Sequence, residues 1–122
     1  MAFDGANIWV ANKGGTTVTK LRARDGATLG TFPLGPAPTG VAFDGTNIWV
    51  STFNNSSNVV KLSRNGTVLR TFTAGSLANG VAFDGSNVWV ANYGSGNVTK
   101  LSRNGVVLGT FSVGSGPVGP GF

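Results

Sequence analysis

The chain has 122 residues, which is enough for one domain with a hydrophobic core but too few for two. Nine Lys and Arg residues against four Asp and no Glu give a formal net charge of +5, which favours acidic partners and also helps solubility. The absence of Cys excludes disulfide bonds, thiolate metal sites and a cysteine nucleophile. No apolar run is long enough for a membrane span and no signal peptide opens the chain, so we expect a soluble protein without a membrane partner, whose compartment the sequence leaves open.

The first 40 residues introduce the pattern that organises the whole chain. Residues 1–10 read Met-Ala-Phe-Asp-Gly-Ala-Asn-Ile-Trp-Val, and Val-Thr-Lys-Leu at 18–21 and Thr-Phe at 31–32 follow. Asp-Gly between apolar stretches is a strong hairpin signal, because Gly tolerates the positive φ that such turns require. Together with twenty glycines, five prolines and few strong helix formers, this pattern predicts an all-β fold.

The second unit, residues 41–80, shows the predicted strands most clearly. Four short apolar stretches are separated by an Asp-Gly turn, an Asn-rich loop and an Arg-Asn-Gly turn, and a Gly-bounded connection leads to the next unit. We expect antiparallel strands at 41–44, 47–51, 58–62 and 67–73. Their apolar character is nearly continuous, which indicates that both faces of the sheet are buried.

The third unit, residues 81–119, repeats the same text at an offset of 40, and residues 120–122 begin a further copy. A four-stranded meander that returns every 40 residues is typical of a β-propeller blade. A single β-sandwich is the rival architecture, but it would not need the same text three times. The sequence therefore predicts three blades, at residues 1–40, 41–80 and 81–119.

One stretch of the second unit carries a resemblance to a known superfamily. Residues 38–50 read Pro-Thr-Gly-Val-Ala-Phe-Asp-Gly-Thr-Asn-Ile-Trp-Val, and an Asn-rich loop and Val-x-Lys-Leu follow. This text resembles blades of the NHL, YVTN and streptogramin-lyase-like propellers. The resemblance extends over the whole chain and implies rings of six or seven blades, in proteins that include binding scaffolds, lyases and lactonases.

Three blades leave two apolar blade faces uncovered, which is costly at about 25 cal/mol per Å² of apolar surface. Head-to-tail association would cover them, because the last blade of one chain can offer the next chain the surface that blades offer within a chain. We therefore expect the chain to partner itself and close a ring by homo-oligomerisation, as a homodimer with six blades or as a homotrimer with nine. Because the chain begins at a first strand and ends between blades, closure is expected to rest on side-chain packing.

The ionisable residues do not favour an enzyme. Asp4, Asp44, Asp84 and Asp25 all precede Gly in predicted turns, where Asp bonds its own backbone. The chain has no His to match the imidazole that the resemblance to streptogramin lyases implies. We therefore expect no catalytic residues, no metal site and no cofactor, and a self-assembling scaffold or binding module of natural or designed origin. A lyase- or lactonase-like enzyme and a carbohydrate-binding lectin are the alternatives.

Aromatic residues recur at fixed positions of each unit. The Trp residues lie in the middle of a strand between Ile or Val residues, so they are expected in the core between blades; as exposed side chains they could instead stack on sugars. The predicted inter-blade core comprises Trp9, Trp49, Trp89, Phe3, Phe43 and Phe83.

Basic residues also recur, with Lys20, Lys61 and Lys100 on the third predicted strand of each unit. We place these strands toward the outside of the blades, where Lys guards a sheet edge against aggregation. Such a basic rim could also meet nucleic acid, but it lacks interleaved aromatic residues, which makes nucleic acid an unlikely partner in the sequence-based interpretation.

The positions at which the copies differ are the predicted recognition sites. They lie in the loop between the second and third strands, which in propellers shares one face with the connections between blades. Drift at tolerant loop tips explains the variation equally well. The candidate ligand-binding residues are Lys13, Phe53, Tyr93, Asn12 and Asn92.

Overall fold

Short antiparallel strands make up the regular structure of this chain. The computed structural model describes residues 1–35, 37–53 and 59–114. Within these ranges the chain forms twelve strands in three sheets and no helix. The described residues therefore contain no helix that could cross a membrane. The all-β prediction is confirmed.

Each sheet is a four-stranded meander in which consecutive strands pair with one another. The first contains β1 (Ala2–Phe3), β2 (Asn7–Ala11), β3 (Thr17–Arg22) and β4 (Thr28–Pro33). The second contains β5 (Pro38–Phe43), β6 (Ile48–Thr52), β7 (Val59–Leu62) and β8 (Val68–Phe72). The third contains β9 (Ala78–Phe83), β10 (Val88–Asn92), β11 (Asn97–Leu101) and β12 (Val107–Ser112). We call these sheets blades 1, 2 and 3.

The blades begin slightly earlier in the sequence than the repeat suggests. β5 and β9 start at Pro38 and Ala78, three residues before positions 41 and 81. The register of the β5–β6 ladder shifts between Pro38 and Gly40 of β5. The register of the β9–β10 ladder shifts between Val90 and Asn92 of β10. A bulge lets a strand continue into the connection while its ladder is interrupted. Residues 120–122 lie outside the described residues.

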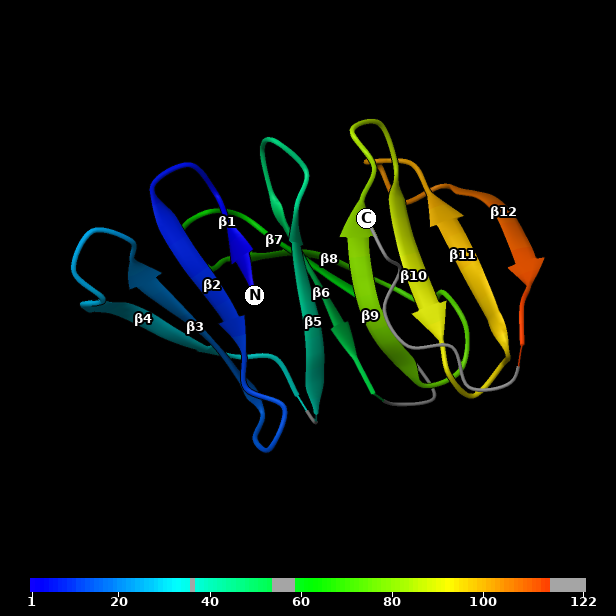
Figure 1. Cartoon of the computed structure of the whole chain (residues 1–122), viewed down its shortest axis with the longest axis horizontal. Coiled ribbons are helices and arrows are strands. Elements are labelled where there is room, and N and C mark those ends of the chain that lie inside the picture. Colours follow the sequence, from blue (N-terminus) through cyan, green and yellow to red (C-terminus); the bar gives the residue numbers. More distant parts are fainter. Residues whose placement is uncertain (36, 54–58, 115–122) are drawn as a thin grey trace.

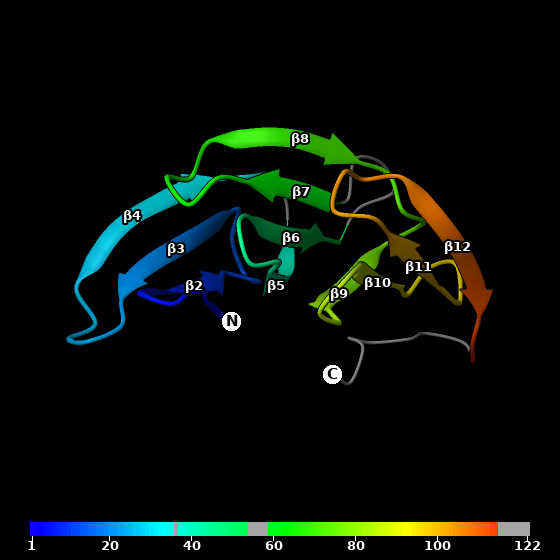
Figure 2. The same ribbon diagram turned by 90° about the horizontal axis from the view of Figure 1, so that it is seen from above.

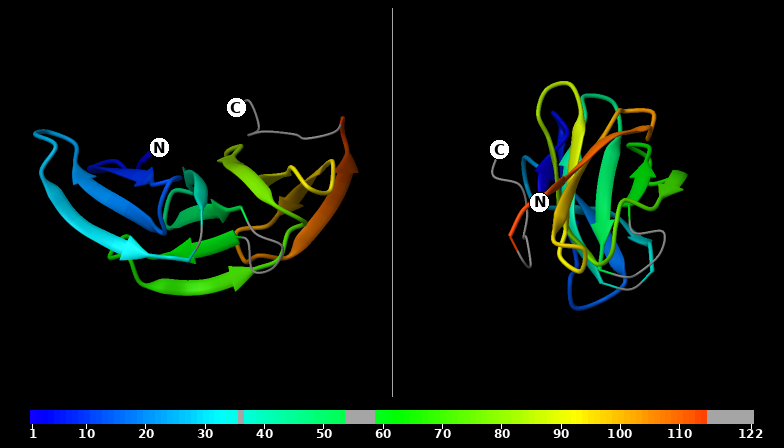
Figure 3. Two further views of the ribbon diagram at one scale, coloured as in Figure 1. Left: turned by 90° about the horizontal axis from the view of Figure 1, so that it is seen from below. Right: turned by 90° about the vertical axis from the view of Figure 1, so that its right-hand side faces the viewer.

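The three blades stand side by side in an arc (Figure 1, Figure 2). Seen from above, the fourth strands β4, β8 and β12 follow the outside of the arc, and β2, β5 and β9 lie toward its inside (Figure 2). Contacts between blades run through the inner strands, with β5 touching β1 and β2 on one side and β9 on the other. The views from below and from the side show the same order (Figure 3).

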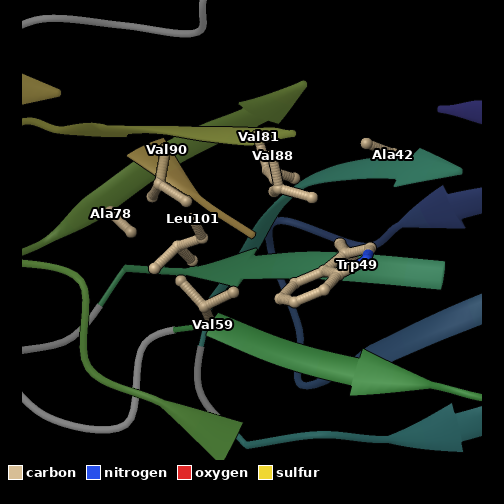
Figure 4. Close-up of a cluster of buried hydrophobic side chains, with 8 residues drawn as sticks. All are labelled: Ala42, Trp49, Val59, Ala78, Val81, Val88, Val90 and Leu101. Atoms are coloured by element: carbon tan, nitrogen blue, oxygen red, sulfur yellow. The ribbon is translucent and has the colours of Figure 1, made fainter. Parts of the chain in front are cut away.

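The hydrophobic core lies between the blades and is divided into two clusters. One joins blades 1 and 2 around the fully buried Trp9, Val18, Ile48 and Leu62. The other joins blades 2 and 3, and Figure 4 shows its side chains meeting between the two sheets. The members of this second cluster are Ala42, Trp49, Val59, Ala78, Val81, Val88, Val90 and Leu101. Each blade therefore gains its stability mainly from its neighbours.

The residues predicted for the inter-blade core differ in burial according to their place in the arc. Trp9 and Trp49 are fully buried, whereas Trp89 of the last blade is only half-buried. Phe43 and Phe83 are half-buried against the two clusters. Phe3 is 57% exposed, and no other blade packs against this side of blade 1 in the described residues. Burial at these positions thus depends on the presence of an adjoining blade.

Each repeated Asp supports its blade twice. Asp4 Oδ1 accepts hydrogen bonds from the Ala6 and Asn7 amides, and Asp4 Oδ2 accepts one from Trp9 Nε1 at 2.8 Å. The same arrangement recurs at Asp44 with Trp49 and at Asp84 with Trp89, both at 2.7 Å. The sequence predicts the turn, but the bond to the indole is not among its predictions.

The lysines of the third strands have a different role from the predicted one. Lys20 Nζ lies 5.3 Å from the centre of the Trp9 ring and donates to the Arg64 carbonyl of the next blade at 2.6 Å. Lys61 does the same with Trp49, at 5.4 Å, and with the Arg103 carbonyl, at 2.7 Å. The prediction of an edge guard is wrong, because the third strand pairs with a fourth one and the lysine links blades instead.

Candidate ligand-binding surface

The two ends of the blades differ in chemistry. The first and third turns of every blade lie at one end, together with all four Asp residues and several Arg residues. The second loops and the connections between blades lie at the other end, which we call the loop end. Lys13 is the only charged side chain in the described residues of the loop end. This end is therefore nearly neutral, and it carries aromatic residues.

Two of the candidate residues meet across the boundary between blades 2 and 3. Phe53 and Tyr93 follow β6 and β10 at equivalent positions of the repeat. Their rings lie 5.7 Å apart between centroids with an interplanar angle of 60°, which is a favourable tilted geometry. Phe53 is half-buried, while Tyr93 is 46% exposed. The pair forms an aromatic surface open to solvent.

The backbone holds both aromatic residues in place. The Phe53 amide donates to the Ala37 carbonyl at 2.8 Å, and the Tyr93 amide donates to the Leu77 carbonyl at 3.0 Å. Ala37 and Leu77 have φ values of 52° and 55°, in the left-handed region that residues other than Gly seldom adopt. Backbone strain of this kind is often found at binding sites. The connections are thus shaped to present the loop that follows them.

Lys13 occupies the corresponding position of blade 1. Its side chain is exposed, on a loop that is tied to the next connection by a bond from the Ala37 amide to the Gly15 carbonyl at 3.2 Å. The ring contact described above joins Phe53 and Tyr93. Lys13 therefore supplies a positive charge at the loop end rather than part of the aromatic pair.

Asn12 and Asn92 lie at the base of these loops. Asn12 is half-buried, and its Nδ2 donates to Thr17 Oγ1 at 2.9 Å and to Thr19 Oγ1 at 2.8 Å. Asn92 is fully buried, and its Nδ2 donates to Asn97 Oδ1 at 2.9 Å and to Thr99 Oγ1 at 2.8 Å. Asn92 Oδ1 has no hydrogen-bond partner among the described residues. A ligand at the surface would meet Tyr93 and not the buried Asn92, which supports the loop from below.

The pKa values of two Asp carboxylates, Asp84 and Asp4, are lowered, which favours their ionised form. Backbone bonds from Asn87 and a bond from Trp89 Nε1 lower the pKa of Asp84 from 3.8 to about 2. Burial opposes the change at Asp4, but bonds from Trp9 and from the Asn7 amide still lower its pKa. A general acid needs the opposite shift. No group of three or more potential metal ligands and no pocket is found in the part of the chain that the structure describes.

Comparison with solved structures places this arrangement among known folds. A chain of Kuenenia stuttgartiensis hydrazine synthase matches with a TM-score of 0.84 and 20% identity over 98% of this chain and 36% of that one. The RRP9 WD40 repeats match with a TM-score of 0.76, at 19% identity over 89% and 36% of the two chains. Saccharomyces cerevisiae Sqt1 matches with a TM-score of 0.78, at 10% identity over 93% and 32%. WD40 repeats are propeller blades.

The chain has a β-propeller fold. It spans about a third of the length of these solved chains, and at such identities the likeness shows the fold alone. No family model and no curated protein matches the sequence. The propeller prediction is thus confirmed, while membership of the NHL, YVTN and streptogramin-lyase-like superfamily stays a prediction.

Proposed function

We propose that this chain is a non-catalytic propeller module that binds a ligand on its loop end. The observation that supports this function is the contact of Phe53 with Tyr93 across two blades, with a ring exposed to solvent. A functional surface in a propeller is built from loops that the blades hold rigidly. Here, the hydrogen bonds to the Ala37 and Leu77 carbonyls supply that support.

The chemistry of the loop end suggests the kind of ligand. An exposed aromatic ring offers an apolar face, and the Tyr93 hydroxyl can both donate and accept a hydrogen bond. Lys13 is the only charged side chain at this end among the described residues, so strong selection for anions is not expected. Suitable ligands are pyranose sugars, which stack on aromatic rings, and apolar peptide side chains. The lectin hypothesis is one arm of this proposal.

An enzyme is the less favoured function. The Asp residues lie at the opposite end of the blades, where all four are bonded within their own turns and Asp4, Asp44 and Asp84 also accept bonds from Trp indoles. A lyase- or lactonase-like reaction would need a bound divalent metal, so calorimetric titration with Mg²⁺, Ca²⁺ and Zn²⁺ tests that alternative. Stoichiometric binding of one of these ions at micromolar concentration would favour it over the proposed function.

The single tyrosine provides a direct test of the binding surface. Tyr93 is the only Tyr in the chain, so incorporation of 3-fluorotyrosine gives one ¹⁹F resonance at the proposed site. Titration with methyl pyranosides and with N-acetyl-phenylalanine amide separates the sugar arm from the peptide arm. We expect one series to shift this resonance in a saturable manner. In Phe53→Ala, the same ligands should bind with lower affinity.

Leu69→Ala is the matched control for Phe53→Ala, because Leu69 is an exposed apolar residue on β8, away from the loop end. It should leave the titration unchanged. The proposal fails if neither series shifts the resonance at millimolar concentration, or if Leu69→Ala weakens binding as much as Phe53→Ala does.

A further inference from the structure

The two interfaces between blades repeat the same contacts, and blades 1 and 3 each carry one side of a further interface. Each blade has a downstream face, which meets the next blade, and an upstream face, which meets the preceding one. Phe32 of blade 1 lies so close to Gly66 that a side chain on Gly66 would overlap its ring, and Phe72 lies against Gly105 in the same way. The bonds from Lys20 and Lys61 to the next blade complete this pattern. Both interfaces therefore use equivalent residues.

The downstream face of blade 3 carries equivalent residues, and its Val and Phe are less buried than their counterparts. Trp89, Val98 and Phe111 are equivalent to Trp49, Val59 and Phe72. Val59 is fully buried and Phe72 half-buried, whereas Val98 is half-buried and Phe111 is 47% exposed. Lys100 lies 5.4 Å from the Trp89 ring centre, in the same pose as the two lysines that reach the next blade. In the part of the chain that the structure describes, no further blade packs on Val98 and Phe111.

The upstream face of blade 1 shows the complementary deficit. Ile8 and Leu21 are half-buried, while the equivalent residues of blades 2 and 3 are fully buried. Phe3 is more exposed than Phe43 or Phe83, which pack against the core clusters. Gly26, the counterpart of Gly66 and Gly105, has open space where those glycines meet a Phe ring. This face thus offers the seat that a Phe of a preceding blade would fill.

We propose that a second copy of this chain docks head to tail, with the downstream face of blade 3 on the upstream face of blade 1. Phe111 of one copy then lies against Gly26 of the other, and Val98 packs on Ile8 and Leu21. The partner is identified by the two internal interfaces, since Phe111 and Val98 on one face, and Ile8, Leu21 and Gly26 on the other, are equivalent to residues that meet there. The inference is independent of the ligand-binding surface, which lies at the loop end.

One feature of the interface differs from the internal ones. Leu21 and Gly26 are separated by four residues, whereas Leu62 and Gly66 are separated by three. The turn that receives the lysine is therefore one residue longer in blade 1, and an exposed Arg22–Asp25 ion pair at 3.1 Å braces it. The lysine bond between copies can thus differ in its acceptor, so the test rests on the apolar contacts.

The test measures the mass of the chain in solution by light scattering and sedimentation. We expect about twice 12.4 kDa for the unaltered chain, with three times this mass for the nine-bladed ring. Phe3→Glu and Phe111→Lys each place a charge in the proposed interface, at positions already exposed in the single chain. Each should weaken one contact about tenfold or more, and a two-interface ring about a hundredfold. Circular dichroism checks that both variants stay folded.

Mixing the two variants separates head-to-tail docking from other associations. A mixed ring has one unaltered interface and one in which the introduced opposite charges meet, so it should form where neither variant alone does. Leu69→Lys, at a 48% exposed residue outside both faces, is the control and should keep the mass of the unaltered chain. A monomeric unaltered chain, or an oligomer that survives either Phe3→Glu or Phe111→Lys, would overturn the proposal.

Discussion

The inter-blade glycine at position 105 allows packing between blades to be measured apart from backbone strain. Gly105 and Gly26 occupy the same turn position, with φ values of 83° and 74°. A Cβ on Gly105 would overlap the Phe72 ring, whereas a Cβ on Gly26 would meet nothing within 4 Å. Substitution by Ala therefore adds the same strain at both positions but a collision at only one.

The expected losses in the free energy of unfolding follow from this difference. Left-handed backbone costs a residue with a Cβ about 1 to 2 kcal/mol, which is the whole expected effect of Gly26→Ala in a monomer. Gly105→Ala should cost a further 1 to 3 kcal/mol or so, as expected for an overpacked core. The Phe72 ring cannot move aside freely, because it stacks on Trp49 with centroids 5.4 Å apart.

Urea unfolding followed by tryptophan fluorescence measures both values. The Phe111→Lys background keeps a second copy from covering Gly26, so that both glycines are compared within one chain. Equal losses for Gly105→Ala and Gly26→Ala would refute the view that Phe72 packs tightly against the next blade.

Three further predictions concern single side chains. Lys61→Met should lower the free energy of unfolding by about 1 kcal/mol, because it removes the bond to the Arg103 carbonyl and the contact with the Trp49 ring. Lys100→Met removes the corresponding contact with the Trp89 ring and should cost less in a monomer; denaturant titration compares the two. Because the pKa of Asp84 is lowered from 3.8 to about 2, its ionised form stabilises the fold above about pH 4, and this contribution disappears as the pH falls toward 2. Trp89→Phe removes an indole donor and should move this acid transition to higher pH, as monitored by circular dichroism; an unchanged transition would contradict the assignment. Asn92→Ala should cost about 1 to 3 kcal/mol in thermal or urea unfolding, because two buried hydrogen bonds are lost, and a neutral effect would mean that these bonds contribute little.

The local structure of each blade could be predicted from the sequence because it depends on neighbouring residues. The Asp-Gly turns after β1, β5 and β9 lie where the repeated text placed them, and Gly5, Gly45 and Gly85 have the positive φ that was expected. The Asp–Trp bond was missed, although the two residues always stand five positions apart. This constant spacing was the signal that could have revealed it.

Contacts between blades could not be predicted in the same way. The sequence places Lys20 and Arg64 44 positions apart, and the path from one to the other depends on how two sheets pack. The sequence therefore predicts the lysines at the outer edge of each sheet, whereas in the structure the fourth strands form this edge. The same holds for Phe53 and Tyr93, which the sequence predicts as separate loop positions and which lie in contact in the structure.

By itself, the sequence determined that this protein consists of three four-stranded repeats with apolar faces, because strand length, turn chemistry and periodicity are local properties. Only the tertiary structure decided which atoms meet across the blades: a lysine on the next carbonyl, a Phe ring on a glycine, and two aromatic rings at the loop end. These contacts depend on the packing of one twisted sheet on the next, and that packing also leaves Phe3 of blade 1 and Phe111 of blade 3 exposed.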